Sequence, residues 1–137
     1  MVRTALKVVL DTNVLVSSIV FGGKPKKAVK LVLEKKVSGV TSKVLLAELS
    51  EVLAKKFGFD QKMIDHLEQK IKKAFIITQP QKTLKILKDV ADNRVLEAAL
   101  ETSCDFIVTG DTELLNLASF RGIKITTVTK FLEEANN

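Results

Sequence analysis

Short apolar runs alternate with stretches of helical periodicity along most of this chain. The first run, residues 6–10, is too short for an independent helix, and polar residues 11–13 follow it directly, so it predicts a buried strand. Chains in which strands alternate with helices form right-handed crossovers, which place parallel strands in one sheet with helices on both faces. The sequence therefore predicts an α/β fold, a three-layer α/β/α sandwich. Its parallel sheet of about five strands is expected from residues 6–10, 38–41, 75–78, 105–109 and 123–125.

Capping and breaking residues predict where the helices begin. Pro25 suits the first turn of a helix, and Ser42 and Asp60 are residue types that accept hydrogen bonds as N-caps. Gln79-Pro80-Gln81 is expected to be a loop, and the stretch from there to Val90 is ambiguous between a helical turn and an extended chain. Asn136-Asn137 is expected to be frayed. The expected helices are residues 14–20, 25–36, 43–56, 61–74, 92–102, 112–119 and 129–135.

Length and composition exclude several classes of protein. The 137 residues correspond to one domain, expected over residues 1–137. Cys104 is the only cysteine, which excludes an internal disulfide and a thiolate zinc cage and fits a reducing, cytoplasmic location. The longest uncharged run, residues 12–23, is much shorter than the roughly 20 residues that span a bilayer, so no membrane insertion is expected. The formal net charge of +6 favours polyanionic partners without singling one out.

Two aspartates come soon after predicted strands. Asp11 directly follows the first strand, and Asp111 follows the fourth strand by way of Gly110. Ligands of an open parallel sheet bind at the carboxyl ends of the strands, so both carboxylates would lie at one edge if these strands are neighbours. An aspartate between a strand and a helix is also a common N-cap, and this alternative stays open for both residues.

Two further acids border apolar helix faces. Glu48 lies three residues after Leu45 and four before Val52, at the edge of the face that packs into the core. Asp92 lies four residues before Leu96, in the first turn of its helix, on the side that the core uses. The alternative for Glu48 is a solvated helix edge. The alternative for Asp92 is an N-cap, or a first-turn acid favoured by the helix dipole.

Four carboxylates brought together would repel one another. At roughly 5 Å and an effective dielectric constant near 20, each pair costs about 3 kcal/mol, which protonation or a cation would relieve. Oxygen ligands without His or Cys select Mg²⁺ or Mn²⁺, and such an ion can polarise a phosphodiester and orient a water. Phosphodiester hydrolysis is therefore the favoured reaction. His66, a lone histidine on an amphipathic helix, is not expected to be a ligand.

Charge is unevenly distributed along the chain. Residues 89–113 contain seven acids and one base, Arg94, whereas residues 24–36 contain six lysines and one acid. The acids would hold a metal ion, and the lysines could track a phosphate backbone. A solvated helix face is an equally good explanation of the lysine run.

The ordered set of these motifs resembles the PIN-domain family over nearly the whole chain. PIN domains are metal-dependent nucleases, mostly endoribonucleases, so the resemblance implies an enzyme, a Mg²⁺- or Mn²⁺-dependent ribonuclease. It implies catalytic and metal-binding roles for Asp11, Glu48, Asp92 and Asp111, and supporting roles for Asn13, Thr109 and Glu113. The resemblance rests on Leu10-Asp11-Thr12-Asn13-Val14-Leu15-Val16, Ala47-Glu48-Leu49, Asp92-Asn93-Arg94-Val95-Leu96-Glu97 and Phe106-Ile107-Val108-Thr109-Gly110-Asp111 with Leu114-Leu115.

Within this family the chain is similar to the small VapC-like ribonucleases classed as toxin components of toxin-antitoxin pairs. This similarity implies an antitoxin protein as a partner and a homodimer. Single-stranded RNA is the expected substrate, because its exposed backbone can enter a shallow acidic edge flanked by lysines. No substrate-binding residue is identified. Asp89-Val90-Ala91-Asp92-Asn93 stands where related sequences often carry Asp-Pro-Asp-Asp-Asn, so one proline and one acid are missing.

Other functions remain open at the level of the sequence. An RNA-processing nuclease outside toxin-antitoxin systems would use the same residues. A phosphatase or phospho-acceptor domain also carries an aspartate after its first strand, but it generally needs a second acid two residues later or an adjacent acidic pair, which Asn13 does not supply. A module that only binds nucleic acid or a protein partner would use its acids as helix caps, and its RNA binding would survive Asp11→Asn without metal.

Overall fold

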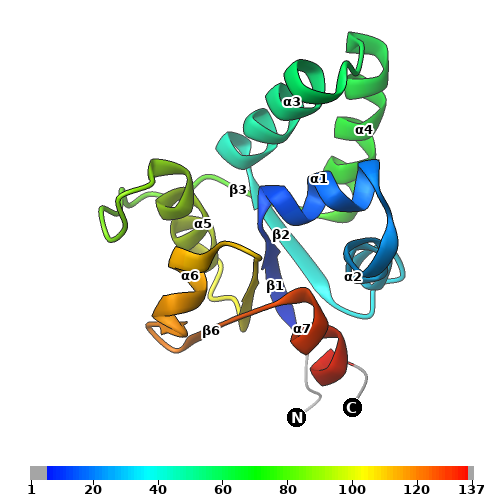
Figure 1. The fold of residues 1–137 in the computed structure, drawn as a ribbon. Helices are drawn as coiled ribbons and strands as arrows, with labels where there is room; N and C mark the ends of the chain where they lie inside the picture. The colour runs from blue at the N-terminus through cyan, green and yellow to red at the C-terminus, as the bar shows by residue number, and fades with distance from the viewer. Residues whose placement is uncertain (1–5, 136–137) are drawn as a thin grey trace.

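The computed structural model describes residues 6–135, which form one sheet with helices packed on both faces (Figure 1). The strands are β1 (Lys7–Leu10), β2 (Ser38–Ser42), β3 (Ile76–Thr78), β4 (Phe106–Val108), β5 (Ser119–Phe120) and β6 (Ile123–Thr126). The helices are α1 (Thr12–Val20), α2 (Gly23–Leu33), α3 (Lys43–Phe57), α4 (Gln61–Ala74), α5 (Val90–Glu101), α6 (Thr112–Leu117) and α7 (Val128–Ala135). The strand order is β3-β2-β1-β4-β6-β5, and only the β5–β6 pair is antiparallel.

Alternate residues of the central strands pack on opposite faces of the sheet, as the two-residue period of a strand requires. Val8 and Leu10 of β1 belong to an apolar cluster with side chains of α1, α2, α3, α4 and α7. Val9 belongs to a second cluster, which is formed mainly with α5, α6 and β6. Both faces of β1 are buried, which explains why its sequence is a continuous apolar run.

The predicted α/β/α fold is confirmed, with one strand more than expected. Residue 119 was expected to end a helix, but α6 ends at Leu117 because Ala118 adopts a φ of 61°. Arg121 and Gly122, with φ of 49° and 85°, then turn the chain back, so that the two-residue β5 pairs with β6. Left-handed residues of this kind leave no periodic signal in a sequence.

Most predicted boundaries agree with the structure to within three residues. Ser42 and Asp60 cap α3 and α4, because their side chains accept hydrogen bonds from Leu45 N (3.2 Å) and Met63 N (2.8 Å). The helix expected over residues 25–36 lies instead at Gly23–Leu33. Residues 79–89 form neither helix nor strand. Within residues 6–135, no helix combines the length and the apolar character needed to cross a bilayer. The expected frayed end, Asn136-Asn137, lies outside the described residues.

Candidate metal centre

The site begins where two neighbouring parallel strands end at the same edge of the sheet. Leu10 of β1 is in register with Val108 of β4, and the next residues are Asp11 and Thr109. The Asp11 N–H donates to the Val108 carbonyl (3.0 Å), and the Thr109 hydroxyl donates to Asp11 Oδ2 (2.6 Å). Both residues are buried, so this short hydrogen bond fixes the orientation of a carboxylate that water does not reach freely.

The two aspartates that follow strands have different local roles. Asp111 is the N-cap of α6, with its Oδ1 accepting from Leu114 N (3.1 Å), and its own N–H donates to Thr109 Oγ1 (2.9 Å). Asp11 precedes α1 but its side chain makes no capping hydrogen bond. The N-cap alternative therefore describes Asp111 and not Asp11, and the Thr109 hydroxyl bridges the two residues.

Asp92 lies in the first turn of α5 and is only 6% exposed. Its Oδ2 is buried without a hydrogen-bond partner. The N-cap of this helix is Asp89, whose Oδ1 accepts from Ala91 N (2.8 Å), so capping does not explain Asp92. Burying a carboxylate oxygen without a hydrogen-bond donor costs free energy. Asp92 Oδ2 therefore needs a partner that the described part of the chain does not supply.

Glu48 of α3 is half-buried, so it is not the solvated edge residue of the alternative interpretation. Burial is the main cause that raises its pKa, and the charge of Asp11 raises it further. The neighbouring Thr12 hydroxyl partly offsets this rise, although Thr12 Oγ1 reaches no acceptor with hydrogen-bond geometry. Glu51, one turn later, is exposed and pairs with Lys55 (2.8 Å). The two glutamates of α3 thus face different environments.

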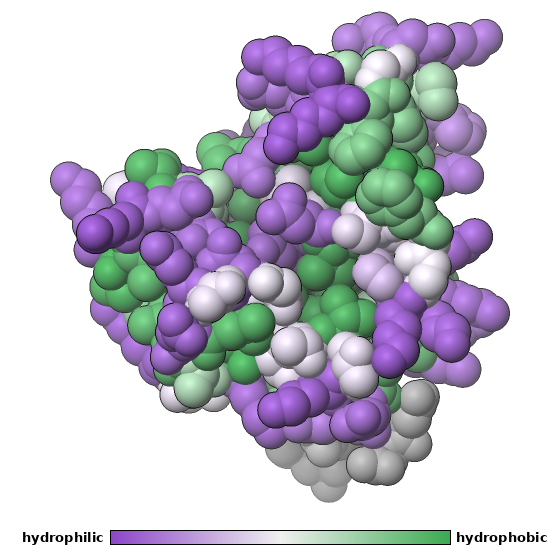
Figure 2. Space-filling model, in the orientation of Figure 1, coloured by the Kyte–Doolittle hydropathy of each residue, from purple (hydrophilic) through white to green (hydrophobic). Residues whose placement is uncertain are grey.

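The carboxylates of this edge influence one another. Burial raises the pKa of Asp11, the Thr109 hydroxyl and the Thr12 backbone N–H lower it, and the charge of Asp111 raises it again. The pKa of Asp92 is raised to about 7, first by burial and then by Asp111, Asp89, Asp11 and Glu113. Asp11 therefore stands in the electrostatic field of Asp111 and influences both Glu48 and Asp92. In the space-filling view, hydrophilic residues gather in the recess between the α5–α6 side and the α1–α3 side (Figure 2).

These residues fit a hard divalent cation by their chemistry rather than by a preformed cage. Among the residues that the structure describes, no three His, Cys, Asp or Glu side chains are grouped closely enough to hold a metal ion as they stand. The donors at this edge are nevertheless all oxygens, two of the carboxylates are buried, and one oxygen is orphaned. Oxygen donors of this kind suit Mg²⁺ or Mn²⁺, and a cation would offset both the burial and the repulsion that raise the pKa of Asp92.

The remaining predicted residues lie around this centre in different ways. Thr109 is fully buried between Asp11 and Asp111. Asn13 is exposed in the first turn of α1, and Glu113 is exposed in the first turn of α6. Thr109 therefore forms hydrogen bonds with Asp11 and Asp111, as a supporting residue would. Glu113 influences the centre through its charge, which raises the pKa of Asp92.

Sequence reasoning assigned no role to two residues at this edge. Asp89 caps α5, and its charge raises the pKa of both Glu48 and Asp92. Thr12 is 1% exposed with an orphaned hydroxyl beside Glu48. The signal for Asp89 was its position three residues before Asp92, where an N-cap precedes the first turn. No local pattern points to Thr12, because its neighbour comes from another helix.

Comparison with known proteins finds a family and a relative that match most of the chain. Residues 7–113 match the family described as the PIN domain. The uncharacterized protein MJ1680 of Methanocaldococcus jannaschii is 30% identical over 152 residues, which cover 98% of this chain and 94% of that protein.

Two solved structures share the fold at low sequence identity. PAE2754 from Pyrobaculum aerophilum has a TM-score of 0.64 at 14% identity, with 96% of this chain and 90% of that chain covered. A chain of VapBC2 from Rickettsia felis, solved bound to a DNA fragment from their promoter, has a TM-score of 0.61 at 16% identity, with 89% and 98% covered. The match to residues 7–113 includes strands β1 to β4 and the four acids Asp11, Glu48, Asp92 and Asp111, and the chain belongs to the PIN domain family.

Proposed function

We propose that this chain is a metal-dependent endoribonuclease in which Asp11, Glu48, Asp92 and Asp111 hold Mg²⁺ or Mn²⁺. The observation that carries the proposal is the orphaned Oδ2 of Asp92, buried in the field of Asp11 and Asp111 at the carboxyl edge of the sheet. Ligands of parallel α/β sheets bind at this edge. Membership of the PIN domain family, whose members are typically metal-dependent nucleases, supports the same reaction.

The chain supplies orientation and charge for such a reaction. Thr109 holds Asp11 through one carboxylate oxygen, and Leu114 N holds Asp111 through one, which makes the other oxygen of each available to a ligand. A divalent cation bound there would polarise a scissile phosphate and activate a water for attack. Water is the nucleophile, and no covalent enzyme intermediate is formed. Asn13, Thr109 and Glu113 support the centre.

The proposed biological setting is a toxin-antitoxin pair, with an antitoxin protein as partner, a homodimer of the single domain 1–137, and the cytoplasm as location. The fold shared with a chain of VapBC2 supports this setting. An RNA-processing nuclease is the second candidate. Expression of the wild-type chain in a bacterial host separates the two, because a toxin arrests growth unless Asp11→Asn is present, whereas a processing nuclease does not.

The test of the enzymatic proposal is cleavage of an end-labelled single-stranded RNA in Mn²⁺. Wild-type protein should cut in Mn²⁺ and not in chelator, and Asp11→Asn and Asp92→Asn should not cut. Asp65→Asn is the matched control, because Asp65 is an exposed carboxylate on α4 that accepts a hydrogen bond from Gln61 Nε2 (2.7 Å). Equal cleavage by wild type and Asp92→Asn would contradict the assignment of the centre. Metal-independent RNA binding without any cleavage would replace the nuclease by a binding module.

A further inference from the structure

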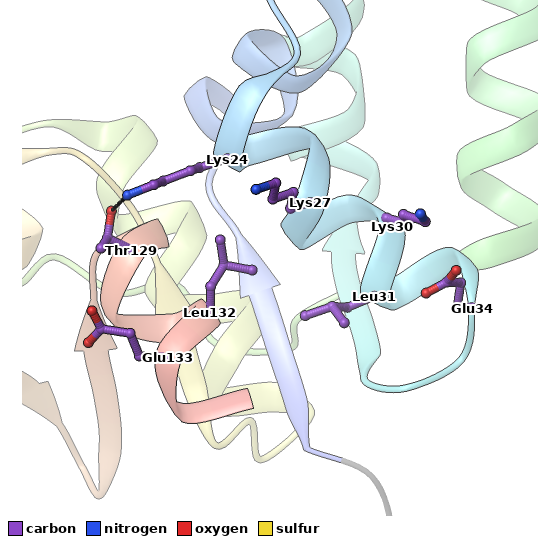
Figure 3. Close-up of a pocket in the computed structure, with 8 residues that line it drawn as sticks. All are labelled: Lys24, Lys27, Lys30, Leu31, Glu34, Thr129, Leu132 and Glu133. Atoms are coloured by element: carbon purple, nitrogen blue, oxygen red, sulfur yellow. Dashed lines mark hydrogen bonds between the residues drawn. The ribbon is translucent and has the colours of Figure 1, made fainter. Parts of the chain in front are cut away.

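A groove between α2 and α7 lies on the same face of the sheet as α1 and has a basic side. It encloses about 390 Å³, and Leu31 and Leu132 are the apolar side chains among its lining. Lys24, Lys27 and Lys30 line its α2 side (Figure 3). Their spacing of three residues places successive α-carbons about 4.5 Å apart along the helix axis and puts consecutive lysines on adjoining parts of the helix surface.

The three lysines are not neutralised by neighbouring acids. Among the described residues none of them forms an ion pair, and Lys24 Nζ donates only to the Thr129 hydroxyl (3.3 Å). Two acids also line the groove, but Glu34 lies at its far end and pairs with Lys36 (3.6 Å). Glu133 lies beyond Leu132, on the side of α7 farther from α2 (Figure 3). The α2 side therefore presents an uncompensated row of positive charge.

The end of this groove that contains Lys24 and Thr129 is connected to the acidic edge through the backbone. Thr129 is three residues after Thr126, the last residue of β6, and Thr109 N donates to the Thr126 carbonyl (3.0 Å). Thr109 is the residue whose hydroxyl holds Asp11. Three residues of extended chain span at most about 10 Å, so the groove opens within a few nucleotides of the carboxylates.

We propose that the α2–α7 groove binds the phosphate backbone of single-stranded RNA and leads it to the acidic edge, an inference that rests on the proposed nuclease function. The groove is small, with a volume of about 390 Å³, which favours a single strand over a duplex. No aromatic side chain lines the groove, so no base is stacked there. Binding is therefore electrostatic, sensitive to salt and indifferent to base sequence.

The test compares two triple variants with the same net charge. Lys24→Gln, Lys27→Gln and Lys30→Gln remove the groove lysines, whereas Lys62→Gln, Lys72→Gln and Lys73→Gln remove three exposed lysines of α4. Binding of a fluorescent single-stranded RNA is measured by anisotropy in chelator at several salt concentrations. The groove variant should bind about tenfold more weakly at low salt, with a salt slope smaller by about 2, which corresponds to three phosphate contacts. The α4 variant should keep the wild-type affinity to within about twofold.

Cleavage kinetics in Mn²⁺ distinguish this inference from the proposed function. The groove variant should raise KM and leave kcat within about twofold of wild type, because the acidic edge is intact. If wild type cuts RNA and both triple variants bind it equally well, the groove assignment is overturned while the nuclease stands. If wild type never cuts but the groove variant alone loses binding, the groove stands and the nuclease fails. If the groove variant lost as much affinity for a duplex RNA as for the single-stranded RNA, relative to wild type, the assignment to single strands would be overturned.

Discussion

Two acids of α5 are buried to the same degree and have opposite surroundings. Asp92 and Glu97 are each 6% exposed. Glu97 Oε2 accepts from Leu84 N (2.7 Å) and forms an ion pair with Arg94, so its charge is matched. Asp92 Oδ2 has no partner, and the charges that add to burial in raising the pKa of Asp92 belong to other acids. Burial alone therefore does not distinguish these two acids, whereas the lack of a partner for Asp92 Oδ2 does.

Glu97 stabilises the loop before α5, whereas Asp92 forms no such contact through its Oδ2. Residues 79–89 contain no helix or strand, so their backbone N–H groups need other acceptors. Glu97 accepts from Leu84 N, and Asn93 Oδ1 accepts from Ile86 N (3.1 Å) and Leu87 N (2.8 Å). One side of α5 thus stabilises the loop before it, and its first turn leaves a carboxylate unsatisfied for a ligand.

The largest expected effect is on the reaction. Asp92→Asn keeps the size of the side chain and removes its charge, so RNA cleavage in Mn²⁺ should fall about 1,000-fold, which corresponds to about 4 kcal/mol in the barrier. Single-turnover cleavage with enzyme in excess measures this loss. Glu101→Gln, an exposed isosteric change near the end of the same helix, should keep the wild-type rate. A loss of less than tenfold for Asp92→Asn would place the reaction elsewhere.

The next largest effect is on stability, at the other acid. Glu97→Ala leaves Leu84 N and Arg94 without their acceptor, so the free energy of unfolding should fall by about 3 kcal/mol. Urea denaturation followed by circular dichroism measures this difference. Asp92→Asn should unfold at the wild-type urea concentration or above it, since it removes a repelled charge. If Asp92→Asn were the more destabilising of the two, the contrast between the acids would be wrong.

The pH dependence of stability should separate the same two sites. The folded pKa of Asp92, about 7, lies above its ordinary value of 3.8, so the folded state binds the proton more tightly than the unfolded state. The stabilisation is complete below pH 3.8 and is lost as the pH rises to 7. In chelator, the free energy of unfolding of the wild-type protein should therefore fall by about 2 kcal/mol more between pH 5 and pH 8 than that of Asp92→Asn. If the free energies of unfolding of the two proteins changed in parallel with pH, Asp92 would not be a buried, repelled carboxylate, and the contrast with Glu97 would be wrong.

The smallest effect concerns the orientation of Asp11. Thr109→Val removes the hydroxyl that donates to Asp11 Oδ2 and accepts from Asp111 N, at constant side-chain shape. The unfolding free energy should fall by about 1 kcal/mol, the usual net value of a buried hydrogen bond. Thr109→Ser keeps the hydroxyl and should restore the Mn²⁺ affinity that Thr109→Val lowers. Equal Mn²⁺ affinity in all three proteins would show that Thr109 only fills space.

Much of the fold could be predicted because its signals are local. The apolar run of β1, the N-caps Ser42 and Asp60, and the helical periodicity of α3 and α4 each depend on residues close together in the sequence. What escaped prediction depends on contacts between distant segments or on backbone conformation. The loop of residues 79–89 is held by side chains of α5, and β5 exists because Ala118 is left-handed.

The candidate centre likewise has features that could be predicted from local sequence and features that could not. The positions of Asp11 and Asp111 after neighbouring strands followed from sheet geometry, and the faces of Glu48 and Asp92 followed from helical spacing. Which aspartate caps its helix could not be predicted, because both precede a helix and the Asp11 carboxylate is held instead by Thr109, a residue distant in the sequence. The role of each acid remains a prediction until it is measured.

Direct binding of Mn²⁺ tests the central claim, that the unsatisfied carboxylates form a metal centre. Electron paramagnetic resonance of free Mn²⁺, titrated with protein in the absence of RNA, gives the affinity without any dependence on activity. Wild-type protein and Glu101→Gln should bind Mn²⁺ equally, and Asp11→Asn and Asp92→Asn should bind it at least about tenfold more weakly. Undiminished Mn²⁺ binding by both aspartate variants would contradict the claim, because the metal would then be held by other residues.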